Sequence, residues 1–234
     1  MNLSEEQKEY LEKNKRGNID KVAATAKTIA SNFPGDLDFL PEDMEHLLYI
    51  FSIGETHEKM FVDGVSIYSK EYGPWDDKAR ELNSQRGAYS VEIAVNEGIS
   101  LNQEEIQAVE SMSSGKNINL RALIMKVAQT YEAVKFPRWS RGEKKEPAKD
   151  FDEVSEILQE EIDFMIRNQE IAEDERQNLT GNLVEAARTT YDMENKILKE
   201  DIKQAVEGVS AKEALDLLSE VDKDYKEQST EEIE

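Results

Sequence analysis

Apolar side chains recur about every three to four residues along most of the chain, which is the spacing that places them on one face of an α-helix. Such a stripe runs from Ile19 to Ala30, and the most strongly apolar stretch follows Pro41 and ends near Gly54. No two neighbouring segments alternate apolar and polar residues as paired strands do. The pattern therefore predicts an all-α fold in which the helix before Gly54 is the most buried element.

Start and stop signals divide the pattern into further helices. Ser4 with Gln7 forms a capping-box pattern, and Asn102 is a suitable N-cap. We expect further helices over residues 60–68, 76–97, 102–109 and 118–136. The basic segment 138–149 contains Gly and Pro, which is typical of a surface loop or linker.

The charge balance changes near residue 150. Residues 151–234 carry 25 of the 51 acidic side chains but only 9 of the 29 basic ones. Helical spacing continues there, and Ser210 with Glu213 forms another capping-box pattern. We therefore expect a helical domain over residues 1–150, an acidic helical region over 151–222, and a disordered tail over 223–234 that has almost no apolar face.

The net charge of -22 and the pI near 4.5 argue against direct binding to nucleic acid, because such binding depends on basic side chains. No apolar run is long enough to span a bilayer, and the first residues do not form a secretory signal. The sequence favours a cytoplasmic protein that does not contact membranes. The chain has no Cys, which excludes disulfides and thiolate chemistry.

Motifs for cofactors and metals are few. The chain has no phosphate-binding Walker loop, no dinucleotide-binding Gly pattern and no zinc-protease helix. His46 and His57 are its two histidines, so a site that needs three imidazoles is excluded. The carboxylate clusters are typical of solvated helix faces. The sequence predicts no cofactor and no bound metal.

The order of several short segments nevertheless resembles a known family. In chain order they are Asn18 to Ala23, Ile50 to Glu55, Asn83 to Ala88, Ala108 to Ser114, Gln129 to Val134 and Arg138 to Arg141. This order resembles the HD-domain superfamily of metal-dependent phosphohydrolases, most closely its HD-GYP branch, over a little more than half of the chain. The most specific part is the segment that begins at Gln129, which is similar to the family's Asp-x-Tyr-Asp-Ala-Leu helix. The resemblance implies an HD-like helical bundle, followed here by the acidic helices.

The resemblance also implies that the metal centre has been lost. The family's His and Asp ligands correspond here to Asn18, Phe51, Ser52, Asn83, Met112, Ser113 and Gln129. Amide and hydroxyl groups are weak ligands for transition metals, and a Phe ring is none. The family's Gly-Tyr-Pro loop is replaced by the short turn at Lys116. We therefore expect a degenerate HD-like domain with no hydrolytic machinery.

Three hypotheses about function follow. The first is a catalytically inactive HD-like domain that acts as a regulatory or protein-interaction module, with an unidentified protein partner and a homodimer as one option. In the family, arginines equivalent to Arg138 and Arg141 lie near the phosphate-binding mouth, so these two, with Lys116, are candidate ligands of a phosphate-containing molecule.

The second hypothesis is a phosphohydrolase or cyclic-nucleotide phosphodiesterase with a rearranged metal centre. The local residues available for such a centre are Asp43, His46, Glu55, His57 and Glu58. The third hypothesis is an acidic protein that mimics nucleic acid and occupies a partner's basic groove.

Overall fold

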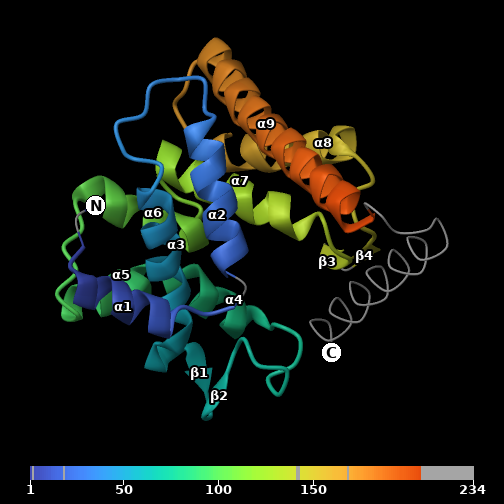
Figure 1. Cartoon of the computed structure of the whole chain (residues 1–234). Coiled ribbons are helices and arrows are strands. Elements are labelled where there is room, and N and C mark those ends of the chain that lie inside the picture. The colour runs from blue at the N-terminus through green and yellow to red at the C-terminus, as the bar shows by residue number, and fades with distance from the viewer. Residues whose placement is uncertain (2, 18, 141–142, 168, 207–234) are drawn as a thin grey trace.

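The structure is a computed structural model that describes residues 1, 3–17, 19–140, 143–167 and 169–206. The described residues are mostly helical, so the predicted all-α fold is confirmed (Figure 1). In chain order the helices are α1 (Glu5–Asn14), α2 (Ile19–Ser31), α3 (Asp43–Ile53), α4 (Asp77–Ser84), α5 (Arg86–Asn96), α6 (Gln103–Ser114), α7 (Leu120–Ala133), α8 (Phe151–Ile166) and α9 (Glu173–Val206). The short elements are two 3-10 turns, η1 (Gly54–Thr56) and η2 (Glu58–Met60), and the strands β1 (Phe61–Val62), β2 (Val65–Ser66), β3 (Arg138–Ser140) and β4 (Glu143–Lys145).

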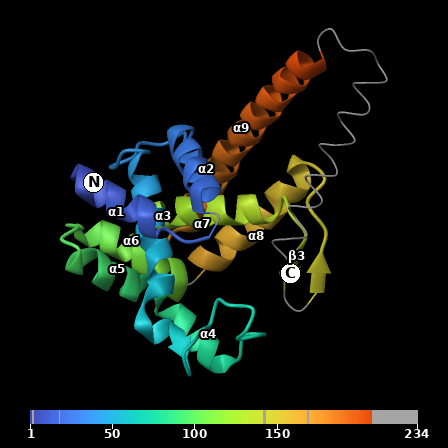
Figure 2. The same ribbon diagram turned by 60° about the horizontal axis from the view of Figure 1, so that its bottom comes forward.

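Helix α3 lies at the centre of the fold. It packs against α2 on one side and against α5 and α6 on the other, and α1 crosses its N-terminal half (Figures 1 and 2). All of its residues are buried except Glu45 and His46, which are half-buried. The prediction that this helix is the most buried element is therefore confirmed.

The predicted caps are present. Ser4 and Gln7 form a reciprocal capping box at α1, and Asn102 caps α6 together with Glu105. Helix α6 ends at Gly115, which adopts a left-handed conformation with φ of 65°. These local signals set the helix boundaries at the N-terminus and around the α6–α7 turn.

Three sequence-based predictions of local structure differ from the structure. The helix expected over residues 60–68 is instead η2 followed by the β1–β2 hairpin, because Asp63 and Gly64 both have positive φ and form its turn. The loop expected over residues 138–149 contains the β3–β4 hairpin. In addition, the helix expected over residues 76–97 is divided at Gln85 into α4 and α5.

Two glycines allow α5 to approach its neighbours closely. A Cβ atom at Gly87 would lie 2.3 Å from the Val109 carbonyl oxygen of α6, and one at Gly54 would lie 2.2 Å from Ser90 Oγ. Any larger residue would push these backbones apart. The start of α5 is thereby held against both α6 and the end of α3.

The described part of the C-terminal region shares the main core. Helices α8 and α9 pack against each other and against α7, and α9 also packs against α2. Their buried residues belong to the same hydrophobic cluster as those of α3; examples are Val154, Leu158, Ile162, Leu183 and Ala186. Helix α9 extends beyond this core (Figure 2), and Met193, Ile197 and Leu198 on its outer part are exposed. The predicted Ser210 cap and the tail lie outside the described residues.

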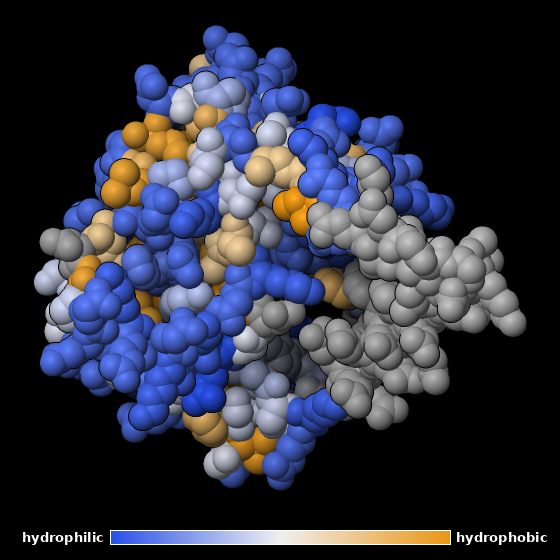
Figure 3. All heavy atoms as spheres, viewed as in Figure 1, coloured by the Kyte–Doolittle hydropathy of each residue, from blue (hydrophilic) through white to orange (hydrophobic). Residues whose placement is uncertain are grey.

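The surface is largely hydrophilic over the face drawn in Figure 3. Among the described helices, none is both long enough and apolar enough to cross a bilayer.

Candidate functional site

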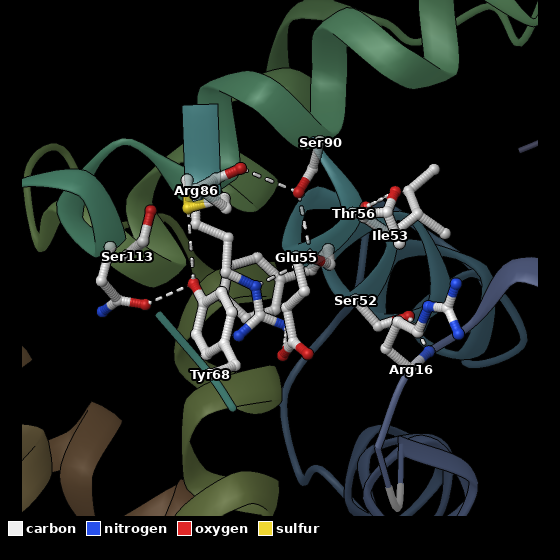
Figure 4. Close-up of polar contacts among 12 residues, drawn as sticks. Arg16, Ser52, Ile53, Glu55, Thr56, Tyr68, Arg86, Ser90 and Ser113 are labelled. Carbon is white, nitrogen blue, oxygen red and sulfur yellow. Dashed lines mark hydrogen bonds and ion pairs between the residues drawn. The ribbon is translucent and has the colours of Figure 1, made fainter. Parts of the chain in front are cut away.

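Arg86, the first residue of α5, lies at the centre of a polar cluster at the end of α3 (Figure 4). Its Nη2 atom is 2.7 Å from Glu55 Oε1, and its Nε donates to the Phe51 carbonyl oxygen at 3.2 Å. The guanidinium carbon lies 4.1 Å from the centre of the Phe51 ring and 5.4 Å from that of Tyr68. We call these four residues the Arg86 cluster. Its arginine is held by one carboxylate, one carbonyl and two aromatic rings.

Local packing brings Arg86 to this place. Gly87 and Gly54 allow the first turn of α5 to lie against α6 and η1, as described above. The Ser90 hydroxyl, one turn further along α5, lies 2.9 Å from both the Phe51 and Arg86 carbonyl oxygens. The end of α3 and the start of α5 are therefore fixed relative to each other, which fixes the direction of the arginine.

Several positions aligned with the family's metal ligands lie around this cluster. Phe51 is part of it, and Asn83 Oδ1 accepts a hydrogen bond from the Tyr68 hydroxyl at 2.8 Å. Ser113 Oγ accepts from the backbone N–H of Gly87 at 2.9 Å. Both of these polar side chains therefore already accept hydrogen bonds from groups of the protein.

The remaining aligned positions have structural roles or lie further away. Ser52 Oγ accepts from the backbone N–H of Arg16 at 3.1 Å and donates to the Tyr49 carbonyl oxygen at 2.7 Å. Met112 is buried in the main core. Gln129 is half-buried on α7, and Asn18 lies outside the described residues.

Burial dominates the electrostatics of the Arg86 cluster. It raises the pKa of Glu55, although the positive charges of Arg86 and Arg16 act in the opposite direction. Burial also raises the pKa of Tyr68 to about 12. The cluster is therefore a poorly hydrated environment in which each charge needs a nearby partner.

Lys126 of α7 is a second cation near this cluster, and no sequence motif pointed to it. Burial lowers the pKa of Lys126; Glu161 opposes that shift, and the nearby Arg86 adds to it. Its ammonium contacts Gln129 Oε1 at 3.5 Å. No carboxylate within the described residues forms an ion pair with it. The sequence did contain a signal for it, because Lys126 stands three residues before Gln129 and therefore lies on the same face of the helix.

The residues predicted to bind phosphate do not assemble in the described part of the chain. Lys116 lines a different cavity, of about 780 Å³, between the α6–α7 turn and the end of α8. The amide side chains of Gln103, Gln107 and Gln169 also line this cavity. The Arg138 side chain and all of Arg141 lie outside what the structure describes.

The residues of the rearranged metal centre do not come together either. His46 lines a cavity beside α1, whereas His57 stacks on Tyr89 with ring centres 4.4 Å apart. Asp43 lies 2.6 Å from the N-terminal amine, and Glu55 pairs with Arg86. Within the described residues, no group of three or more His, Asp or Glu side chains could hold a metal ion.

Comparison of the chain with protein-family models, with curated protein sequences and with solved structures gives no match. The resemblance to HD domains therefore depends on the sequence segments named above. The two cations near the end of α3 each have a carboxylate that acts on them, Glu55 on Arg86 and Glu161 on Lys126, so their charges are offset within the chain.

Proposed function

We propose that this chain is a non-catalytic relative of the HD phosphohydrolases that works as a regulatory binding module. The observation that carries the proposal is the place of Arg86, which forms an ion pair with Glu55 and lies over the ring of Phe51. The resemblance would place a metal ligand at the position of Phe51. A guanidinium at this position repels divalent cations, and an aromatic ring offers them no lone pair.

The side chains at the aligned positions do not fit a catalytic metal. Ser52, Asn83 and Ser113 already hydrogen-bond to groups of the protein. A metal would have to break these bonds and also compete with the positive charge of Arg86. We therefore derive no hydrolytic step for this site.

The framework glycines support the HD-like part of the proposal. Gly54 and Gly87 both belong to the segments that carry the resemblance, and both stand where a Cβ atom would collide with a neighbouring helix. A domain that kept its architecture but lost its chemistry would keep such glycines. Its metal ligands would be replaced by other residues. Such a domain acts through what it binds, whether a ligand or a protein partner.

Metal loading and hydrolysis together test the proposal. The purified chain would be incubated with manganese and iron, freed of loose ions, and measured by elemental mass spectrometry and for cleavage of bis(p-nitrophenyl) phosphate. We expect neither stoichiometric metal nor hydrolysis. Stoichiometric metal with turnover would contradict the proposal, and loss of both in a His46→Ala or His57→Ala variant would then identify an unexpected centre.

A further inference from the structure

The buried face of α9 continues beyond the point where the core ends. Leu183, Ala187 and Thr190 are buried and recur every three or four residues, which places them on one face of the helix. Ile197 and Leu198 follow Thr190 by two helical turns, so they lie on the same face. Ile197 is nevertheless 57% exposed, and Leu198 is 56% exposed.

Helix α9 is still bonded to other parts of the core just before these two residues. Met193 Sδ accepts from Asn32 at 3.8 Å, and Glu194 accepts from Tyr131 of α7 at 2.7 Å. Residues 195–206 extend the helix for about 18 Å past these bonds (Figure 2). A stretch of helix this short gains most of its stability from packing of its apolar face. The face that carries Ile197 and Leu198 is therefore a surface for another helix.

The segment that follows α9 has the sequence of such a helix. Residues 210–221 lie outside the described part of the structure, but Ser210 with Glu213 forms a capping-box pattern at their start. Their apolar residues recur at the spacing of one helix face: Ala214, Leu217, Leu218 and Val221.

The connection between α9 and this segment is short. Residues 207–209, which include Gly208, join Val206 to Ser210. Connections of this length are typical of helices that lie side by side and antiparallel. A helix over residues 210–221 would be about 18 Å long, so it would reach back along α9 as far as Ile197 and Leu198.

We propose, independently of the non-catalytic function, that residues 210–221 form a helix that folds back on α9 and covers Ile197 and Leu198. A second copy of the chain is the other occupant to consider, and two features disfavour it. The net charge of -22 opposes close approach of two copies. The segment is also tethered to α9, which gives it an effective concentration in about the millimolar range or above.

Disulfide formation in the whole chain tests the proposal. The chain has no Cys, so Leu198→Cys with Leu218→Cys introduces a single pair. These positions stand equally far before and after Gly208, and an antiparallel pair of helices brings them side by side. We expect an intramolecular disulfide to form at least about tenfold faster than in the control pair, Lys196→Cys with Leu218→Cys, because Lys196 lies on the other side of α9.

Two outcomes of this experiment would overturn the proposal. The first is an equal rate of disulfide formation in the two pairs. The second concerns the oligomeric state of the unmodified chain, which light scattering should show to be a monomer. A dimer that Leu198→Ser dissociates would assign the face to a second copy.

Hydrogen exchange provides a test that needs no cysteine. Leu218→Ser should speed the exchange of the backbone amides of residues 195–206 by at least about tenfold and leave residues 173–190 unchanged, because only the outer part of α9 loses its cover. Asp216→Ser lies on the opposite face of the segment and is the matched control, which should change neither region. Equal effects of the two variants, or no effect of Leu218→Ser, would contradict the proposal.

Discussion

Two lysines near α7 differ in how their charge is compensated. Lys135 follows the last turn of α7 and contacts the carboxylates of Glu132 and Glu194. Lys126, within the same helix, contacts the amide of Gln129 and no carboxylate among the described residues. Both are partly or mostly buried, so the difference lies in the partners and not in the environment alone.

The compensated lysine belongs to a network that holds helices together. Thr25 of α2 donates to Glu132 at 2.5 Å, and Tyr131 of α7 donates to Glu194 of α9 at 2.7 Å. Lys135 contacts both carboxylates, so α2, α7 and α9 are joined by paired groups. This comparison teaches that the two lysines depend on their carboxylates to different degrees, because removing one partner of a buried, hydrogen-bonded pair leaves the other charge uncompensated.

The largest effect is expected where a paired charge is removed. Glu132→Met leaves Thr25 without its acceptor and Lys135 with one carboxylate fewer, so we expect a loss of about 3 kcal/mol in the free energy of unfolding. Urea denaturation would measure it. Glu156→Met on the exposed face of α8 is the control and should change stability by less than about 0.5 kcal/mol. Equal losses in the two variants would contradict the role of the network.

A smaller loss is expected from Glu55→Gln. This change leaves Arg86 without its carboxylate partner, and we expect the unfolding free energy measured by urea denaturation to fall by about 2 kcal/mol. A variant as stable as the original chain would show that Arg86 needs no compensating charge.

Lys126→Met should have the opposite sign. Burial disfavours the charge of Lys126 more than Glu161 favours it, so removing that charge should raise the unfolding free energy by about 1 kcal/mol. Lys135→Met should lower it, because Glu132 and Glu194 lose their cation. Chemical denaturation of the two variants side by side measures both signs. Destabilisation by both changes would remove the distinction between the two lysines.

The smallest effect concerns pH. Because burial lowers the pKa of Lys126, the folded chain releases this proton at a lower pH than the unfolded chain, whose value is near 10.5. The cost of the buried charge is therefore fully present below the lowered pKa and shrinks as pH rises from there toward 10.5, with a slope of at most about 1.4 kcal/mol per pH unit. The gain in unfolding free energy from Lys126→Met should therefore become smaller across that pH range.

The Lys126→Met variant must be compared with the original chain because tyrosines titrate in the same pH range. The raised pKa of Tyr68, about 12, keeps its proton on in the folded state, so its contribution to stability falls as pH rises above 10. The contribution of Tyr68 is the same in the variant and in the original chain, so it cancels when their unfolding free energies are subtracted. An advantage that stays constant with pH would show that Lys126 is not desolvated.

The helices could be predicted from the sequence because their signals are local. Ser4 and Asn102 cap helices where the pattern indicated, and Gly54 follows the buried α3. The β1–β2 hairpin was missed because the apolar residues around it were assigned to a helix, although Asp63-Gly64 is a strong turn signal.

The site could be predicted only in part. The alignment pointed to Phe51, Asn83 and Ser113, and the structure places all three in or beside the Arg86 cluster. It did not point to Arg86, because the place of Arg86 beside Phe51 depends on how α5 packs against the end of α3, and no local pattern encodes that. Lys116 was chosen for its nearness in sequence to other basic residues and lies in another cavity.

The most direct test of the account is a crystal structure of the whole chain grown with manganese. The account predicts the Arg86–Glu55 ion pair over Phe51, with no anomalous manganese signal coordinated by protein side chains at the end of α3. A manganese ion held there by side chains of the chain would contradict it.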